Sequence, residues 1–308
     1  MIIILMATYN GENFIRQQIE SIINQSYQDF MIYICDDCST DNTVSIINEF
    51  HQKYPDKICF EKTKQNTGAA KINFINMMLK YKADYVMLSD QDDIWLTNKI
   101  ELTMKKMQDA ELNFGKETPI LIHTDLAVVN TQLEMINHSY RKMIDVDYSR
   151  KALKQALVQN IVTGCTVMYN KSLSNLLNSV PSNMCMHDWW LFLIASAFGK
   201  IESLEEATVL YRQHFSNSVG AIDAKNSKYR ISRLLNNKQY KQDMIATYIQ
   251  ASSFYSEFCT KMSEQQLSLV KEYINIPSLS WIMRVITTLR LGTLKKGVLR
   301  NIANFILM

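Results

Sequence analysis

The first 90 residues alternate short apolar runs with helical patterns, and this alternation restricts the fold more than any other feature. The apolar runs occupy residues 2–6, 30–35, 58–60 and 85–88. Between them, apolar side chains recur at helical spacing over 14–23, 44–50 and a stretch that ends at 77–79. Strands that alternate with helices predict a parallel sheet with right-handed crossovers. We therefore expect an α/β fold whose mostly parallel sheet is flanked by helices.

Polar clusters follow three of these four runs, at residues 8–12, 36–41 and 90–93. An isolated Asp-x-Asp is most often a solvated acidic turn, because short motifs match by chance. Ligands of open α/β sheets, however, bind beyond the carboxyl ends of the strands. All three clusters fall at that edge of the predicted sheet. Their convergence favours a binding site there over a solvated turn.

The cluster Asp90-Gln91-Asp92-Asp93 indicates the chemistry of that site. Carboxylates packed this closely repel one another, so ionising all of them is costly without a cation. Their oxygens suit the hard ions Mg²⁺ and Mn²⁺, and Mg²⁺ usually binds one or two carboxylates together with substrate phosphates. The cluster therefore predicts a place where a metal ion meets a diphosphate.

Composition narrows the class of protein. A chain of 308 residues with 47% apolar content can bury one large core or two smaller ones. The net charge of +3 is too small to indicate a nucleic-acid partner. Of the six cysteines, Cys35 and Cys38 form a CxxC pair, but no second pair has zinc-like spacing, so we expect the two to be buried reduced thiols, as in a cytosolic protein. We expect no signal peptide and no membrane span, because no apolar run reaches ~18 residues.

Past residue 93 the pattern changes. Residues 120–123 and 126–130 predict two short strands, and 161–169 predict a loop followed by a strand. The segment His187-Asp188-Trp189-Trp190 opens an apolar helix. A carboxylate at a helix start has a structural explanation, since it can cap the helix and favours its dipole. The two tryptophans offer either a flat surface for a sugar face or core packing, and we expect Trp190 in the core.

Three motifs together resemble the nucleotide-sugar half of family 2 glycosyltransferases with the GT-A fold. They are Ala7-Thr8-Tyr9-Asn10-Gly11, Asp36-Asp37-Cys38-Ser39-Thr40-Asp41 and Ser89-Asp90-Gln91-Asp92-Asp93-Ile94-Trp95. The resemblance implies a Rossmann-like GT-A domain at 1–220, with a nucleotide-sugar half at 1–95 and an acceptor half at 96–220. A helical C-terminal region would occupy 221–308. Cys38 departs from the family pattern, in which Gly is common, and a tight turn there would be slightly strained.

The resemblance implies roles for the donor side. Thr8, Tyr9, Asn10 and Glu12 would line the nucleotide pocket, and Asp36 or Asp37 would accept the imide N–H of a pyrimidine base. Asp90 and Gln91 would also bind the nucleotide sugar. Mg²⁺ or Mn²⁺ would be held by Asp90, Asp92 and His214, with Asp93 in support. Arg212, in the motif Tyr211-Arg212-Gln213-His214 that Asn217 and Gly220 follow, would contact the diphosphate, because Arg suits bidentate phosphate contact.

The acceptor side follows in the same way. Inverting sugar transfer needs a carboxylate that takes the proton from the acceptor hydroxyl while the metal carries the leaving diphosphate. Asp188 matches the family position of this general base. Thr163-Gly164-Cys165 resembles the acceptor-side loop of bacterial rhamnosyltransferases, so Gly164 and Cys165 would bind the acceptor, with Trp189 as a possible sugar platform.

The C-terminal stretch from Ser278 to Met308 combines apolar residues with five basic residues and no acid. A basic amphipathic composition is typical of helices that lie in a membrane interface. The alternative is a helix that packs on the catalytic domain or on a second copy of the chain. Since enzymes of this kind often extend lipid-linked saccharides, the resemblance favours an anionic membrane surface as partner, at the inner face of the bacterial plasma membrane.

The whole pattern is most similar to bacterial rhamnosyltransferases of polysaccharide biosynthesis. It implies metal-dependent, inverting transfer of L-rhamnose from dTDP-L-rhamnose to a polysaccharide or lipid-linked saccharide. The same fold acting on another UDP- or dTDP-sugar is the alternative. A nucleotidyltransferase would need a basic, Gly-rich loop after the first strand, whereas residues 8–12 contain an acid and no Lys. The intact set of Asp90, Asp92, Asp188 and His214 argues against a non-catalytic scaffold.

Overall fold

The computed structural model describes residues 1–214 and 237–308 and divides the chain into two compact units. The first unit contains Met1–Tyr140, Val162–Val180 and Gly199–Ala221, and the second contains Arg141–Ile161, Pro181–Phe198 and Ile222–Met308. The predicted boundary at residue 220, like Asn217 and Gly220, lies outside the described residues. Among the described helices, none is both long enough and apolar enough to cross a membrane.

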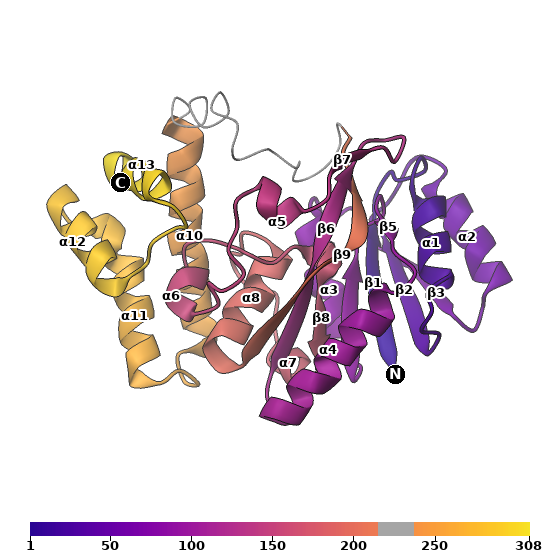
Figure 1. The fold of residues 1–308 in the computed structure, drawn as a ribbon, viewed down its shortest axis with the longest axis horizontal. Coiled ribbons are helices and arrows are strands. Elements are labelled where there is room, and N and C mark those ends of the chain that lie inside the picture. Colours follow the sequence, from indigo (N-terminus) through magenta and orange to yellow (C-terminus); the bar gives the residue numbers. More distant parts are fainter. Residues whose placement is uncertain (215–236) are drawn as a thin grey trace. The chain divides into compact units, whose positions relative to one another are not determined.

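The first unit is built on one mixed sheet (Figure 1). Its strand order is β3-β2-β1-β4-β8-β6-β9-β5, with β7 beside β6. The strands are β1 (Ile2–Thr8), β2 (Phe30–Asp36), β3 (Ile58–Lys62), β4 (Tyr85–Ser89), β5 (Ile94–Trp95), β6 (Ile120–Val129), β7 (Met135–Asn137), β8 (Met168–Asn170) and β9 (Lys200–Arg212). The predicted α/β fold with a parallel N-terminal sheet is confirmed, because β1 pairs in parallel with both β2 and β4.

The order of the first four strands creates a crevice. The chain moves outward from β1 to β2 to β3 and then returns to β4 on the other side of β1. With right-handed crossovers, this reversal puts α3 (Ala70–Lys80) on the face opposite α1 (Ile15–Ile23) and α2 (Thr43–Lys53). Ligand sites in such sheets lie where the strand order reverses. The polar segments after β1 and β4 are at that point.

Two features of the sheet differ from the sequence prediction. The expected pair of strands at 120–123 and 126–130 is one continuous strand, β6, whose pairing with β9 shifts register around Asp125. The irregularity explains why the sequence shows a polar break inside a single strand. The strand β9 was not predicted, because its run of acidic residues hides the alternation. It runs parallel to β6 and antiparallel to β5, and its end carries Arg212.

One long helix and two short ones complete the first unit. They are α4 (Lys99–Phe114), the 3-10 helix η1 (Gly164–Thr166) and α7 (Lys171–Ser174). Asn170 fixes the last of these, since its side chain accepts from the Leu173 N–H and from the Ile120 N–H. The loop and strand predicted at 161–169 are therefore present as η1 followed by β8.

The second unit is helical, as predicted for the C-terminal region. It contains α6 (Leu153–Ala156), α8 (His187–Phe198), α10 (Asn237–Phe258), α11 (Glu264–Asn275), η2 (Ile276–Ser278), α12 (Trp281–Leu291) and α13 (Val298–Leu307), and α5 (Tyr140–Met143) begins at its border. Figure 1 shows α10 to α13, in orange to yellow, gathered together. Trp190, which is fully buried as predicted, packs edge-on against Phe254 at 5.6 Å between ring centroids. The Arg300 guanidinium donates to the carbonyls of Ile144 and Asp145, which ties α13 to the segment after α5.

Candidate active site

The loops that follow β1 and β2 are joined by hydrogen bonds. The backbone N–H groups of Asn10, Gly11 and Glu12 donate to the side chains of Ser39 (2.8 Å), Thr43 (2.7 Å) and Asp41 (3.1 Å). In return, the Asn10 side-chain oxygen accepts from the Thr40 N–H at 2.8 Å, and Glu12 Oε2 accepts from the Asn42 N–H at 2.9 Å. Two segments about 30 residues apart therefore behave as one polar rim at the carboxyl edge of the sheet.

Asp36 and Asp37 are both buried and both bind protein donors. Asp36 accepts from the Ser39 N–H at 2.9 Å and from the Thr8 hydroxyl at 3.1 Å. Asp37 accepts from the Thr67 N–H at 2.8 Å and from the Thr67 hydroxyl at 2.7 Å. These hydrogen bonds to charged groups hold the loops in place. Thr8 is itself buried, whereas the predicted pocket residue Tyr9 is 48% exposed.

Cys38 occupies the turn that the sequence suggested would be strained. Its φ is +65°, a left-handed conformation that disfavours residues with a Cβ atom. Cys38 Sγ lies 3.4 Å from the carbonyl oxygen of Thr63, to which the thiol donates. The expectation of a buried thiol is right for Cys35 but wrong for Cys38, which is half-buried because the turn projects it beyond the sheet.

Gln91 connects the acidic motif to the β1 loop. Its side-chain oxygen accepts from the Tyr9 N–H, and its side-chain NH₂ donates to the Tyr9 carbonyl, both at 2.9 Å. A Cβ atom on Gly11 would lie 2.4 Å from Gln91 Oε1, so only glycine leaves room for this amide. Sequence reasoning placed Gln91 among the donor-binding residues. The structure adds that Gln91 fixes the backbone of the loop that would bind the donor.

Asp92 lies beside His214, and the predicted role of both residues as metal ligands stays a prediction. The distance from Asp92 Oδ2 to His214 Nε2 is 2.8 Å. Phe14 supports the pair, because the His214 ring stacks on it at 4.6 Å between centroids and the Arg212 guanidinium lies over it at 4.9 Å. The sequence analysis assigned Phe14 only to the apolar face of a helix. The sequence feature that could have identified Phe14 is its position directly before α1, one turn after the β1 motif.

Arg212 binds three protein oxygens from three separate segments. Its guanidinium donates to the Asp92 carbonyl (3.0 Å), the Thr131 carbonyl (3.0 Å) and Gln17 Oε1 (2.6 Å). The residue is buried, and burial lowers the pKa of the guanidinium. These contacts show Arg212 as a brace for the acidic motif. The predicted contact with a diphosphate stays a prediction.

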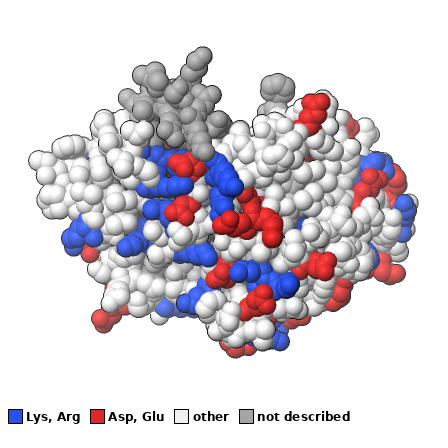
Figure 2. All heavy atoms as spheres, viewed as in Figure 1, with Lys and Arg blue, Asp and Glu red and all other residues white. Residues whose placement is uncertain are grey.

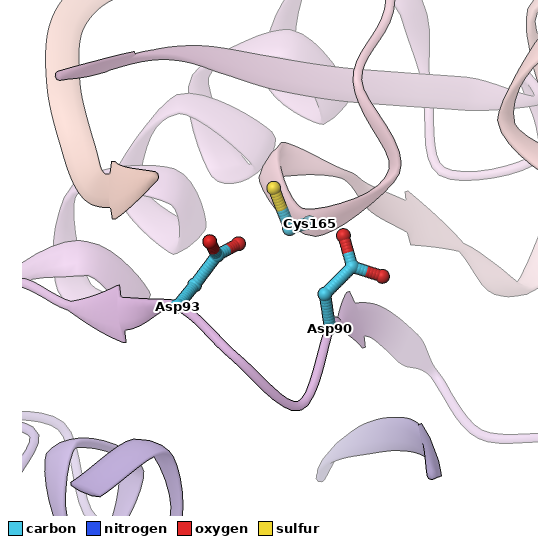
Figure 3. A group of neighbouring side chains, drawn as sticks. All are labelled: Asp90, Asp93 and Cys165. Carbon is cyan, nitrogen blue, oxygen red and sulfur yellow. The ribbon is translucent and has the colours of Figure 1, made fainter. Parts of the chain in front are cut away.

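The remaining carboxylates gather around a thiol (Figure 3). One ligand atom from each of Asp90, Asp93 and Cys165 lies within 4.8 Å of the other two. Burial, followed by the charges of Asp92 and Asp90, raises the pKa of Asp93. Burial and the Asp93 charge likewise raise the pKa of the Cys165 thiol. Lys99, which sequence reasoning missed, lies fully buried nearby, and burial lowers its pKa to about 8 against the opposing effects of Cys165 and Asp93.

These side chains fit a divalent cation chemically. Carboxylates and imidazole are ligands that Mn²⁺ accepts, and carboxylates are the ligands that Mg²⁺ prefers. Burial, followed by the charges of Asp92 and Asp90, raises the pKa of Asp93, and a bound cation would offset the repulsion among these carboxylates. The structure brings Asp92 to His214, and Asp90 to Asp93 and Cys165. The predicted metal set of Asp90, Asp92 and His214 stays a prediction.

The predicted acceptor residues fall in both units. Asp188 lies in the first turn of α8, in the second unit, and is buried. Its Oδ1 accepts from the Trp189 N–H at 2.7 Å, which is a local helix-start contact. The half-buried Trp189 donates from its indole N–H to the Ala156 carbonyl at 2.6 Å. Gly164 and Cys165 belong to η1 in the first unit, and both are buried, so the Cys165 thiol faces the carboxylates instead of an open surface.

Comparisons with known proteins identify relatives. A family model described as "Glycosyl transferase family 2" matches residues 3–176. The dTDP-rhamnosyl transferase RfbG of Shigella flexneri is 31% identical over 255 residues, which cover 81% of this chain and 86% of that protein. Staphylococcus aureus TarS, solved with UDP, superposes with a TM-score of 0.56 at 13% identity over 99% of this chain and 86% of that chain. A mannosyltransferase of Pyrobaculum calidifontis, solved with GDP-Man and Mn²⁺, gives 0.50 at 15% identity over 95% and 85% of the two chains.

The Gln91–Tyr9 contact leads to a test by double mutation. Gln91→Ala removes two neutral hydrogen bonds, each of which contributes about 1 kcal/mol. We therefore expect it to weaken the binding of dTDP, used as the candidate nucleotide, by about thirtyfold in calorimetry. Gly11→Ala, which pushes the amide aside, should weaken binding similarly. In the Gln91→Ala background, Gly11→Ala should cost little more, because the group it displaces is already gone.

The exposed Gln52 on α2 provides the control, and Gln52→Ala should leave dTDP affinity unchanged. If the losses of dTDP affinity in Gly11→Ala and Gln91→Ala simply added, the Gln91 amide would not be the group through which Gly11→Ala weakens binding.

Proposed function

We propose that this chain, which belongs to glycosyl transferase family 2 and has the GT-A fold, transfers L-rhamnose from dTDP-L-rhamnose to a saccharide acceptor with inversion. The observation that carries the proposal is the joining of three polar segments at the point where the strand order reverses, with Asp92 and His214 paired there. The similarity to a dTDP-rhamnosyl transferase over most of both chains supports the choice of sugar.

On the donor side, this chain supplies a rigid loop and a set of metal ligands. The rim formed by Asn10, Gly11 and Glu12 with the β2 loop would bind the nucleotide, beside the exposed Tyr9. Among the described residues, Asp37 Oδ2 accepts a hydrogen bond only from the Thr67 hydroxyl. We assign this oxygen to the pyrimidine imide N–H. Asp92 and His214 would hold Mg²⁺ or Mn²⁺, which supplies charge to the leaving diphosphate.

On the acceptor side, Asp188 is the proposed general base. Its Oδ1 is engaged by the next backbone N–H, which fixes the carboxylate at the start of α8. The acceptor hydroxyl gives its proton to this carboxylate as the hydroxyl oxygen attacks the anomeric carbon. The neighbouring His187 is buried, and burial lowers its pKa to about 3, so this imidazole stays neutral near pH 7 and places no charge beside Asp188. Gly164 and Trp189 are proposed to contact the acceptor.

The choice of nucleotide and metal can be tested together. The purified chain should hydrolyse dTDP-L-rhamnose slowly in the presence of Mn²⁺ or Mg²⁺, and should prefer it over UDP- and GDP-sugars. Asp92→Asn should abolish metal-dependent turnover while the melting temperature is kept, because a neutral amide is a poor metal ligand. Asp109→Asn, an exposed change on α4, is the matched control.

Near wild-type turnover of Asp92→Asn without added metal would refute the metal site. Preference for a UDP-sugar would leave glycosyl transfer as the function and replace rhamnose with the sugar found. UDP is the nucleotide bound by TarS, which shares this fold. Equal affinity for GDP and dTDP would remove the pyrimidine contact.

The role of Asp188 is tested by Asp188→Asn. Asparagine keeps an oxygen for the Trp189 N–H, so the helix start should survive. Transfer should fall by about 10²-fold or more, because the amide cannot take a proton. Calorimetry should show unchanged dTDP binding. Transfer at a near wild-type rate would reduce Asp188 to a helix cap.

We also propose that the chain binds membranes through α12 and α13. Nine large apolar side chains on these helices are exposed, among them Ile282 at 62%, Leu299 at 65% and Ile306 at 69%. In Figure 2 this part of the surface is mainly uncharged. Several of the basic residues have partners, since Arg290 pairs with Glu272 and Lys296 pairs with Asp145. Apolar insertion should therefore contribute more to the free energy of membrane binding than charge does. The basic composition alone would suggest salt-sensitive binding.

Liposome co-sedimentation measures this binding. The intact chain should sediment with vesicles that contain anionic lipid, and high salt should reduce but not abolish sedimentation. The double change Leu299→Gln with Ile306→Gln should release it, because each fully inserted side chain contributes about 1.5–3 kcal/mol. Leu112→Gln, at a side chain that is 85% exposed on α4, is the control.

If the intact chain stays in the supernatant, the membrane proposal fails. If it is then a dimer in solution and the double variant is monomeric, α12 and α13 bind a second copy of the chain.

A further inference from the structure

The cluster of Asp90, Asp93 and Cys165 differs from the Asp92–His214 pair in its donor atoms. It combines two carboxylates with a thiol, contributed by the segment between β4 and β5 and by η1. In Figure 3 the carboxyl groups of Asp90 and Asp93 lie on either side of the Cys165 side chain. Asp90 is half-buried, and the other two residues are buried, so an ion would enter past Asp90.

Asp93 supplies the second observation. This residue is fully buried, and its Oδ1 accepts from the Arg212 N–H at 3.2 Å. Its Oδ2 is buried and accepts no N–H or O–H hydrogen bond within the described part of the chain, which leaves the Cys165 thiol as its neighbour. A buried acceptor without a donor is costly, and a cation is one of the few groups that satisfies it. The Cys165 thiol is the neighbouring group, and a thiol is a weak donor.

Charge counting favours a divalent ion. Two carboxylates and a thiolate carry three negative charges. The buried Lys99, whose ammonium lies over the Trp95 ring at 4.7 Å, interacts with both Asp93 and Cys165 and provides one positive charge. A divalent cation supplies the other two, which leaves a neutral buried cluster, and buried charge is tolerated when it is balanced in this way.

The thiol decides which ion. Thiolate ligands select soft and borderline ions such as Zn²⁺, whereas Mg²⁺ and Mn²⁺ prefer oxygen. We propose that Asp90, Asp93 and Cys165 form a site for a thiol-binding divalent cation such as Zn²⁺, separate from the Asp92–His214 pair. Binding forms a Zn–S bond and releases the thiol proton to solvent. If the proposed function holds, Zn²⁺ takes Asp90 away from the donor and inhibits transfer.

Cadmium is the probe, because a Cd²⁺–thiolate bond has an ultraviolet charge-transfer band. Titration of the whole chain with Cd²⁺ should give a saturable, stoichiometric band. Cys165→Ser should lose this tight component, and Asp93→Asn should weaken it at least tenfold. Cys259→Ser, at a half-buried thiol directly after α10, should retain it, and so should Asp92→Asn. An undiminished band in Cys165→Ser, or its loss in Asp92→Asn, would overturn the proposal.

X-ray absorption at the zinc edge needs no variant. The Zn²⁺-loaded wild-type chain should show one sulfur at about 2.3 Å with oxygen ligands at about 2.0–2.2 Å. A shell of nitrogen and oxygen alone would assign the ion elsewhere and refute the site. These spectra do not depend on catalysis, so they stand even if rhamnosyl transfer is not found.

Where transfer is found, Zn²⁺ should inhibit the wild type and Cys259→Ser more strongly than it inhibits Cys165→Ser. The rate of each protein with Zn²⁺ is compared with the rate of the same protein with Mn²⁺. Equal inhibition would remove the regulatory half of the proposal.

Discussion

The parallel register of β1 with its two neighbours is the constraint on which the site depends. Thr8 lies opposite Asp36, and Met6 lies opposite Ser89, so the chain leaves all three strands at nearly the same level. A shift of one residue would turn every side chain of a strand to the other face. It would also separate the backbone N–H groups of the β1 loop from Ser39 and Thr43. The buried apolar strands therefore determine the position of the polar residues that follow them.

The distant strand β9 completes what the N-terminal sheet begins. By pairing with β5, it brings Arg212 and His214 back to a motif more than a hundred residues earlier in the chain. Phe14 lies beneath both side chains. Arg212 contacts the acidic motif, and Gln91 ties it to the β1 loop, so the motif is held in place. The cation that we propose would therefore need little reorganisation to bind there.

The sequence predicted what is local and missed what depends on pairing. Strand ends, helix starts and the motifs at 7–11, 36–41 and 89–95 follow from short patterns, and the structure places them as expected. The continuity of β6 and the existence of β9 depend on a neighbouring strand, since acidic residues within β9 are acceptable only in that pairing. The sequence also does not predict which residues surround Asp93. Lys99 and Cys165 approach it from helix α4 and from η1, and no linear motif indicates a buried lysine. Likewise, the many hydrogen bonds of Asp36 and Asp37 come from residues that no sequence pattern pairs with them.

The two borders of the sheet have a consequence for the behaviour of the protein in a crowded cell. One border is β3, which ends in Glu61 and Lys62, and the other is β5, which has only two residues. Long, flat, uncharged border strands recruit strands from other molecules and nucleate aggregates. A charged border at one side and a minimal one at the other disfavour such recruitment. The large sheet can therefore keep its two borders without acting as a template for misassembly.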